Sequence, residues 1–347
     1  SDIFVFKRVR PKPLPESLLL FGAMVAESSP SDSIQNARYA LLAKQKPRLK
    51  TLQLPMAGDI TDVAVKIAAD LDNSVLPIQG PPGAGKTYIG SLMIAELSKR
   101  GMRVGVTAVS HKVITNILSA VVSRSGAVTC AQKTGSTSED HPPSIEVLEN
   151  NDAAVSALNG GRVVGGTAWL WANEKMEQKL DYLFIDEAGQ MSLAIALAAG
   201  RAAKNIILLG DPQQLEQPQK GDHPEGAEVA ALNHLLDGRP TIADDRGLFL
   251  EKTWRLNPAI CRFTSGQFYE GRLSSQDGRD CQVIRGGSVF PESGLAFYPV
   301  PHEGNQNQSL EEVAAVRCVF DILLDGSHSW VDADGIEAEL TLDDILV

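Results

Sequence analysis

A glycine-rich loop in this chain has the composition of a phosphate-binding site. Residues 80–87 read GPPGAGKT and fit the pattern G-x-x-x-x-G-K-[ST], between an apolar run and a stretch of helical spacing. Glycines let backbone N–H groups turn towards phosphate oxygens, and the N-terminus of the next helix adds positive potential. We predict that Lys86 reaches the β- and γ-phosphates of a nucleotide and that the Thr87 hydroxyl binds Mg²⁺. The residues expected to bind nucleotide are Gly80, Pro81, Pro82, Gly83, Ala84, Gly85, Lys86, Thr87 and Tyr88.

An acidic pair, Asp186–Glu187, follows the apolar run YLFI. A buried strand would carry this pair to the carboxyl edge of a parallel sheet, where ligands bind. We expect Asp186 to hold Mg²⁺ through water, and Glu187 to orient and deprotonate an attacking water. A solvated strand end is the alternative for such a pair on its own, and the phosphate loop upstream argues against it.

A third polar segment, GDPQQL at residues 210–215, follows the next apolar run. An amide there would lie beside the γ-phosphate and could report its presence, because it both donates and accepts hydrogen bonds. On its own the segment could be a turn capped by Asp211.

The elements that must position these groups follow from the apolar pattern. Short apolar runs bounded by glycine or polar residues predict buried strands. These runs are Ser74–Gln79, Arg103–Val109, Arg162–Gly165, Tyr182–Asp186 and Asn205–Gly210. Helical spacing predicts helices over Val63–Leu71, Ile89–Leu97, Lys112–Val122 and Leu193–Ala203. This alternation indicates an α/β fold, a parallel sheet with helices on both faces.

Composition narrows the class of protein. The chain has 347 residues, 43% of them hydrophobic, and no apolar run long enough for a membrane span, which needs about 18 residues. Its start lacks the pattern of a secretory signal. Four separated cysteines without a C-x-x-C pair are typical of reduced thiols in a cytoplasmic protein, and a metal cluster is not expected. The net charge of −11 argues against a general polyanion binder, so any nucleic-acid contact must be a local groove.

Three segments are expected along the chain. Residues 1–55 carry six scattered prolines and one short helical stretch, Ala37–Gln45, and are expected to be a linker or the stub of an upstream domain. Residues 56–244 are expected to form the first domain, and residues 123–159 within it are expected to hold a surface excursion. Residues 245–347 are expected to begin a second domain that is cut short, because the final TLDDILV reads as the start of a buried strand.

Five motifs together resemble those of superfamily 1 helicases. They are IQGPPGAGKT, GTAW at residues 166–169, DEAGQ at 186–190, GDPQQL and TWRLNP at 253–258, in that order. The resemblance runs from about Val75 to the end and is to the branch with the nonsense-mediated-decay helicase and Dna-type nuclease–helicases. Within it, the chain is most similar to the helicase half of bacterial fusions with a RecB-like nuclease. The resemblance implies a RecA-like P-loop NTPase domain, a partial second RecA-like domain, and ATP-dependent movement along single-stranded nucleic acid.

The resemblance also implies residue roles. Gln214 would sense the γ-phosphate, and Arg255 would touch it from the second domain. Trp254 stands where the family has a tyrosine near the adenine and would stack on the base. The residues that would contact single-stranded nucleic acid are Ser110, His111, Thr167 and Trp169. The alternatives are an ion pair for Arg255, a core position for Trp254, a helix cap for Ser110 and structural roles for the other three.

Two departures from the family bear on activity. No glutamine occurs in residues 57–74, where the family has one that reads adenine. No segment of this chain matches the family's last motifs, which include a second arginine finger. We therefore expect binding of ATP and Mg²⁺ with slow hydrolysis, and the alternative function is a nucleotide-binding regulatory or scaffold module.

Other classes fit less well, and the expected partners follow from the helicase resemblance. Transporter ATPases need an LSGGQ-type signature and GTPases need NKxD, and both are absent. An AAA+ protein would not explain GDPQQL followed by TWRLNP. The expected partner is single-stranded nucleic acid, DNA before RNA, with 5′→3′ movement. A nuclease domain in a longer protein, a monomeric state, a role in DNA repair and a cytoplasmic location without membrane contact complete the expectations.

Overall fold

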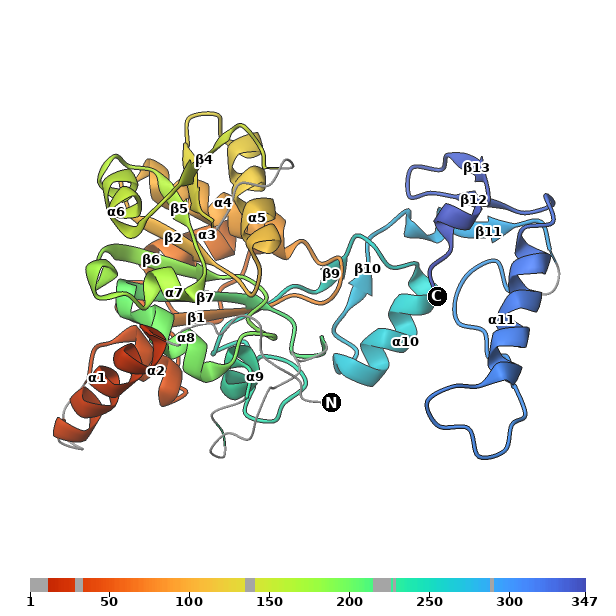
Figure 1. Ribbon diagram of the computed structural model, residues 1–347, viewed down its shortest axis with the longest axis horizontal. Coiled ribbons are helices and arrows are strands. Elements are labelled where there is room, and N and C mark those ends of the chain that lie inside the picture. The colour runs from red at the N-terminus through yellow and green to blue at the C-terminus, as the bar shows by residue number, and fades with distance from the viewer. Residues whose placement is uncertain (1–11, 29–33, 135–140, 215–225, 227–228, 288–289) are drawn as a thin grey trace, which may run out of the picture. The chain divides into compact units, whose positions relative to one another are not determined.

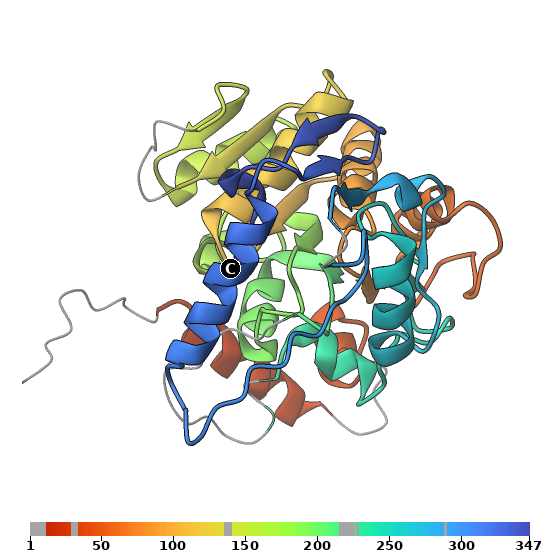
Figure 2. The same ribbon diagram turned by 90° about the vertical axis from the view of Figure 1, so that its right-hand side faces the viewer.

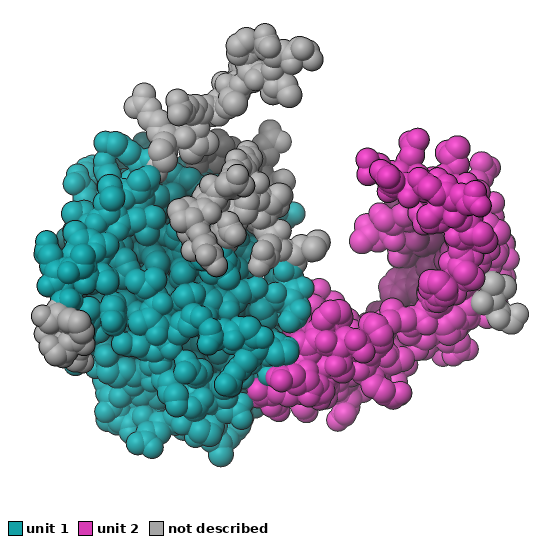
Figure 3. Space-filling view, turned by 90° about the horizontal axis from the view of Figure 1, so that it is seen from below, with its two compact units in different colours: residues 1–81, 85–250 teal, residues 82–84, 251–347 magenta. Residues whose placement is uncertain are grey.

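The chain forms two compact units, which Figure 3 colours separately. The computed structural model describes residues 12–28, 34–134, 141–214, 226, 229–287 and 290–347. Unit 1 comprises residues 1–81 and 85–250, and unit 2 comprises residues 82–84 and 251–347. The expected domain boundaries after residues 55 and 244 remain predictions.

Unit 1 is built on an eight-stranded parallel sheet (Figure 1). The strands are β1 (Val75–Gln79), β2 (Val104–Thr107), β3 (Cys130–Lys133), β4 (Ile145–Leu148), β5 (Val163–Gly165), β6 (Leu180–Ile185), β7 (Ala203–Gly210) and β8 (Leu248–Phe249). Their order is β4-β3-β5-β2-β6-β7-β1-β8, and every pairing is parallel. All residues of β1 and β2 are buried, as their continuous apolar runs require of strands covered on both faces. The five predicted strands are confirmed.

Helices cover both faces of this sheet (Figures 1 and 2). They are α1 (Leu14–Glu27), α2 (Ala37–Leu42), α3 (Ile60–Asp70), α4 (Lys86–Lys99), α5 (His111–Arg124), α6 (Asn151–Asn159), α7 (Ala168–Trp171), α8 (Leu193–Ala199) and α9 (Ala231–Leu236). A Cβ at Gly165 of β5 would lie 2.5 Å from Ile114 of α5, and one at Gly105 of β2 would lie 2.9 Å from Trp171 of α7. Gly105 pairs in register with Val164, the neighbour of Gly165, so these two glycines face opposite sides of the pleat. Helices α5 and α7 therefore cover opposite faces of the sheet.

The N-terminal region is more ordered than its prolines suggest. Helix α2 confirms the short helix expected there, but α1 was not anticipated. The Ser17 hydroxyl of α1 donates to the carbonyl of Ala198 in α8 at 2.8 Å. Arg38 of α2 donates to the Ser17 carbonyl at 2.8 Å, and its guanidinium carbon lies 4.2 Å from the centre of the Phe21 ring. This packing depends on contacts between residues far apart in the sequence, which the local sequence pattern does not reveal.

Much of the segment 123–159, which is expected to hold a surface excursion, belongs to the large sheet and its helices instead. This segment contains β3, β4 and α6, and the two strands form one end of the sheet. The two middle residues of β4, Glu146 and Val147, are less buried than its two ends, and the strand has a neighbour on one side only, β3. A short strand of this kind lacks the continuous apolar run by which the central strands were recognised.

Unit 2 consists of short elements. They are β9 (Lys252–Thr253), α10 (Pro258–Phe268), β10 (Ser274–Ser275), β11 (Val283–Arg285), α11 (Leu310–Leu323), β12 (Ser329–Val331) and β13 (Glu337–Glu339). Strands β10 and β9 pair in parallel, and β11, β12 and β13 form an antiparallel sheet. The second domain is thus partial, with a small sheet. The segment expected to begin a buried strand forms a 3₁₀ turn at Leu342–Asp344, and Leu346 is 98% exposed. Among the described residues, no helix is long and apolar enough to cross a membrane.

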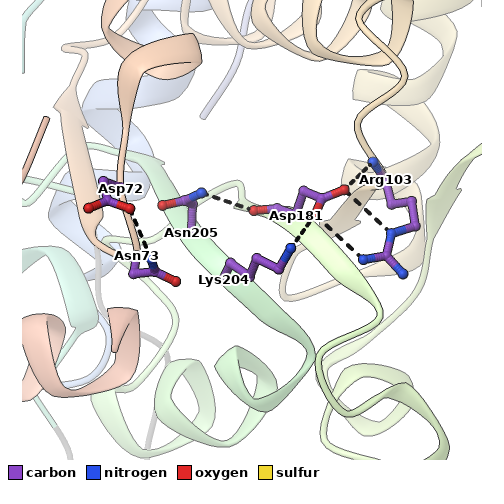
Figure 4. Close-up of polar contacts among 6 residues, drawn as sticks. All are labelled: Asp72, Asn73, Arg103, Asp181, Lys204 and Asn205. Atoms are coloured by element: carbon purple, nitrogen blue, oxygen red, sulfur yellow. Dashed lines mark hydrogen bonds and ion pairs between the residues drawn. The ribbon is translucent and has the colours of Figure 1, made fainter. Parts of the chain in front are cut away.

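Polar side chains close the amino edge of the large sheet (Figure 4). Asp181, at the start of β6, accepts hydrogen bonds from the Arg103 backbone N–H at 2.9 Å and from the Lys204 ammonium at 3.0 Å. Asn205 of β7 donates to the Asp181 carbonyl and accepts from the backbone N–H of Ser74, which precedes β1. These side chains tie together the starts of four adjacent strands.

Candidate functional site

The three predicted nucleotide segments follow three neighbouring strands of unit 1. The phosphate loop follows β1, the Asp186–Glu187 pair follows β6, and the segment that contains Gln214 follows β7. These strands lie in the order β6-β7-β1, with all pairings parallel. Parallel strands end at the same edge, so the fold brings the three segments to one place although they are far apart in sequence.

The phosphate loop leads directly into a helix of 14 residues, α4. Gly85 is the N-cap of α4 with φ 84°, a left-handed conformation that favours glycine. The Lys86 ammonium donates to the Gly80 carbonyl at 2.5 Å and lies 3.5 Å from the Pro81 carbonyl. Thr87 stands in the first turn, where backbone N–H groups have no partner within the helix. The loop therefore offers N–H groups, an ammonium and a hydroxyl to an anion at the helix N-terminus.

The acidic pair lies in an environment that disfavours charge. Burial raises the pKa of Asp186 to about 6, although a hydrogen bond from the Glu187 N–H and the charge of Lys86 oppose that shift. Burial also raises the pKa of Glu187, against the same lysine. Glu187 has φ 55°, which is uncommon for a residue with a side chain. Strain of this kind is concentrated at functional sites, and a raised carboxylate pKa suits a group that accepts a proton.

The backbone after the acidic pair fits tightly against the end of β7. The Ala188 N–H donates to the Leu209 carbonyl at 2.9 Å. A Cβ on Gly189 would lie 2.1 Å from the carbonyl oxygen of Asp211. Only glycine allows this approach, so the turn that carries the acidic pair and the turn that carries Gln214 contact each other through main-chain atoms.

Gln214 has the buried, unsatisfied atom expected of a ligand sensor. Its side-chain Oε1 is buried and has no hydrogen-bond partner among the described residues. Asp211 accepts from the Gln213 N–H at 3.2 Å, so the turn cap considered for this segment also exists. An unsatisfied buried amide oxygen costs free energy, which a hydrogen-bond donor from a ligand would recover.

In unit 2, the segment Thr253–Arg255 packs on the middle of the phosphate loop. The Thr253 hydroxyl donates to the Pro82 carbonyl at 2.9 Å, and the Trp254 N–H donates to the Gly83 carbonyl at 2.9 Å. A Cβ on Gly83 would lie 2.3 Å from the Cβ of Arg255. Arg255 forms no ion pair with the described residues, and Trp254 is 55% exposed. The alternatives considered for these residues, an ion pair for Arg255 and a core position for Trp254, are therefore not observed among the described residues.

The four residues expected to contact nucleic acid lie at the carboxyl ends of β2 and β5, which are adjacent. The Ser110 hydroxyl accepts from the Val113 N–H at 3.3 Å, which gives it the helix-cap role considered as its alternative. His111 is exposed, and the Thr167 side chain forms no cap hydrogen bond. Trp169 is 39% exposed, whereas Trp171, two residues later, is buried. The exposed indole could stack on a base.

Two further side chains that support the nucleotide segments were not identified from the sequence. Gln79, the last residue of β1, donates to the Pro240 carbonyl at 2.9 Å and accepts from the Ile242 N–H at 2.7 Å. The guanidinium carbon of Arg124 lies 4.0 Å from the centre of the Tyr88 ring. The contact orients one face of an aromatic ring that is 45% exposed and next to Thr87. Neither contact has a local sequence signal.

The donor set fits a nucleotide with Mg²⁺. Oxygen ligands suit this cation, and both the Thr87 hydroxyl and the Asp186 carboxylate stand at the carboxyl edge of the sheet. The carboxylate accepts one hydrogen bond from the described part of the chain, from the Glu187 N–H at 2.9 Å. The unsatisfied oxygen of Gln214 is a further group, which a water molecule beside a bound phosphate could satisfy by donating a hydrogen bond.

Comparisons with known proteins find similarity to ATP-dependent helicases. Residues 62–233 match the AAA domain family. The chain is 30% identical over 169 residues to the DNA replication ATP-dependent helicase/nuclease DNA2 of Saccharomyces cerevisiae, covering 46% of this chain and 11% of that protein. It is 25% identical over 284 residues to the ATP-dependent helicase upf1 of Schizosaccharomyces pombe, covering 67% of this chain and 30% of that protein. An arterivirus nonstructural protein 10 helicase solved with DNA aligns at a TM-score of 0.39 and 15% identity, covering 62% of this chain and 43% of that one.

Proposed function

We propose that this chain, which belongs to the superfamily 1 helicases of the Dna2 and Upf1 type, is an ATP-driven motor that moves along single-stranded nucleic acid. The observation that carries the proposal is the meeting of three segments at the ends of β6, β7 and β1. A phosphate loop alone would indicate nucleotide binding. The acidic pair and a glutamine with an unsatisfied oxygen at the same edge add groups suited to hydrolysis and to sensing its product.

Each group has a role in the proposed reaction. The loop N–H groups and Lys86 bind the β- and γ-phosphates, and Thr87 and Asp186 hold Mg²⁺. When bound, Mg²⁺ neutralises charge that develops on the phosphate oxygens. Glu187 orients a water and accepts its proton, and Gln214 hydrogen-bonds at the γ-phosphate position. Trp254 stacks on the base, and Arg255 supplies positive charge to the γ-phosphate.

The proposed nucleotide site and the proposed site for single-stranded nucleic acid lie at the same edge of the sheet in unit 1. The ends of β2 and β6 are adjacent, and the Asp186 N–H donates to the Thr107 carbonyl at 2.9 Å. Ser110 and His111 follow Thr107 closely in the sequence. A shift at the acidic pair therefore has a short main-chain route to the strand-binding residues, which supports coupling of hydrolysis to movement.

The test is an ATPase assay of the chain with and without single-stranded DNA and RNA. We expect the rate of ATP hydrolysis to rise when single-stranded nucleic acid is present. We expect it to fall on the order of 100-fold or more in Lys86→Ala, because the variant lacks the ammonium that stabilises negative charge developing on the phosphate oxygens. The matched control is Lys179→Ala, which removes an exposed lysine just before β6, at the opposite edge. Turnover that Lys86→Ala leaves unchanged would contradict the phosphate-loop assignment. Tight ATP binding without turnover would favour the regulatory or scaffold module instead.

The wider setting is also a proposal, because the chain spans only 11% and 30% of the two relatives described above. A nuclease domain in the longer protein, which the name of the yeast relative suggests, would direct the motor towards DNA and its repair. Preference for DNA over RNA, 5′→3′ movement, a monomeric state and a cytoplasmic location are kept as predictions. Strand-displacement assays with DNA and RNA duplexes of both polarities would test the first two.

A further inference from the structure

A groove on the helices of unit 1 contains none of the residues expected to bind nucleotide, Mg²⁺ or nucleic acid. Helix α4 packs against α3 and against α5 (Figure 1). The groove has a volume of about 380 Å³ and is lined by residues of these three helices and by Ser125, which follows α5. This volume falls in the range of pockets that hold ligands. The proposed function gives the groove no role.

The groove carries an excess of positive charge. Its ionisable lining residues are the cations Lys66, Lys99, Arg100 and Arg124 and the acids Asp62 and Glu96. The Arg100 guanidinium pairs with Glu96 at 2.9 Å, so these two charges neutralise each other. Lys66 and Lys99 are exposed and form no ion pair or side-chain hydrogen bond with the described residues. Three cations and one carboxylate therefore remain, in a chain whose net charge is −11.

An aromatic ring holds Arg124 in place. Its guanidinium carbon lies 4.0 Å from the centre of the Tyr88 ring, and it forms no ion pair with the described part of the chain. Stacking occupies the face of a guanidinium and leaves its N–H donors in the plane, where they match the geometry of a carboxylate. A side chain ordered in advance loses less conformational entropy when it binds a ligand.

Apolar side chains also line the groove. They are Val65 of α3 and Leu92 and Ala95 of α4, of which Val65 and Leu92 are partly exposed. A ligand that covers this apolar surface removes it from water, which is favourable. The phosphates of a nucleic acid offer no apolar group to this surface, and Asp62 would repel them. A peptide with both carboxylates and aliphatic side chains complements the cations and the apolar surface together.

We propose that this groove is a docking site for an acidic peptide segment of a partner protein, in which carboxylates are interspersed with aliphatic side chains. Carboxylates of the segment pair with Lys66, Lys99 and Arg124. An aliphatic side chain packs on Leu92, and Asp62 accepts a hydrogen bond from a backbone N–H of the segment. Exposed ion pairs are individually weak, so the groove suits a transient partner.

Titration of the wild-type chain with designed peptides tests the chemistry of the occupant. The probe is the fluorescein-labelled peptide DDLEDLDE, followed by fluorescence anisotropy at low ionic strength. We expect it to bind on the order of 10-fold more tightly than NNLQNLNQ, which lacks the charges. It should also bind more tightly than DDSEDSDE, which lacks the aliphatic side chains. Equal affinity for the three peptides, or binding of none, would overturn the proposal.

Charge reversal tests the location of the site. Lys66→Glu combined with Lys99→Glu should weaken binding of DDLEDLDE on the order of 10-fold or more, because like charges then face each other. The matched control is Lys179→Glu combined with Arg239→Glu, which changes the net charge equally at exposed positions outside the groove. Equal losses in the two double variants would show that net charge alone governs binding and would contradict the assignment. Both reversed lysines are exposed, so the melting temperature by circular dichroism should stay that of the wild type.

Labelled oligodeoxythymidine distinguishes a nucleic acid from a peptide as the occupant. We expect the Lys66 and Lys99 double variant to bind it with the affinity of the matched control. A loss as large as that for DDLEDLDE would assign the groove to nucleic acid and overturn the proposal. These variants change no residue assigned to ATP hydrolysis, so failure of the docking proposal leaves the proposed function standing. If the wild type bound no oligonucleotide, the proposed function would fail, and the peptide titration would still decide the docking proposal.

Discussion

The two edges of the large sheet in unit 1 have opposite character. At the amino edge, polar side chains find partners within the protein, as Asp181 does with Arg103 and Lys204. At the carboxyl edge, Gln214 and Thr134 each have a buried atom without a partner in the described part of the chain. Burial acts to raise the pKa of both carboxylates, but hydrogen bonds from Arg103 and Lys204 bring the pKa of Asp181 below its usual value, whereas the pKa of Asp186 stays raised. One edge stabilises the sheet, and the other keeps groups available for ligands.

Strand β6 carries both kinds of carboxylate, one near each end. Asp181 is its second residue, and Glu187 follows its last residue by two positions. An amide replacement at each place makes the same chemical change in the two environments. We expect the two variants to lose different properties, activity for one and stability for the other.

The largest effect is expected at Glu187. Glu187→Gln removes a general base, which typically contributes about 10²–10⁴-fold to a rate, and it retains the shape of the side chain. ATP should still bind, and its hydrolysis should fall by that factor. Single-turnover hydrolysis and nucleotide-binding titrations separate the two steps. Normal hydrolysis in this variant would show that Glu187 is not the base.

The second largest effect is expected where the turn that carries the acidic pair contacts the turn that carries Gln214. Gly189→Ala would put a Cβ about 2.1 Å from the Asp211 carbonyl oxygen, so the turns must separate. We expect the free energy of unfolding to fall by about 1–3 kcal/mol, the usual cost of overpacking, together with lower turnover.

Urea denaturation followed by circular dichroism measures that loss. Gly126→Ala is the matched control, because a Cβ there meets nothing within 4 Å. If Gly189→Ala were as stable and as active as Gly126→Ala, the close approach of the two turns would not matter for function.

The smallest effect is expected at the amino edge. Hydrogen bonds from Arg103 and Lys204 outweigh burial and hold the pKa of Asp181 below its usual value. A lowered pKa stabilises the folded state above the unfolded pKa of about 3.9, and that stability is lost as the pH falls through the folded value. Asp181→Asn should therefore lower the free energy of unfolding by about 1 kcal/mol at pH 7, the net scale of one hydrogen bond.

The pH dependence of this difference is the sharper measurement. The wild type and Asp181→Asn should differ most above about pH 4, and the difference should close progressively below it. Turnover at pH 7 should be the same in both proteins at a temperature where both are folded. A loss of turnover as large as that of Glu187→Gln would contradict the division of roles between the two edges.

The sequence by itself determined the parts that depend on local pattern. Continuous apolar runs identified the five strands β1, β2, β5, β6 and β7, and the spacing G-x-x-x-x-G-K-T identified the phosphate loop. Parallel topology follows from the alternation of strands and helices, so the meeting of the loop with Asp186 and Gln214 was predictable too. The roles of individual site residues remain predictions that the variants above test.

Only the tertiary structure decided which polar groups have partners. Strand β3 joins the sheet through pairing with β4 and β5, and its place beside His111 depends on contacts distant in sequence. Exposed Trp169 and buried Trp171 have the same side chain, and only the packing around α7 distinguishes them. Asp181 and Asp186 differ in the same way, because a pKa depends on burial and on donors that other strands supply. A residue type sets what chemistry is possible, and the surrounding fold sets whether the group is neutralised by the protein or left for a ligand.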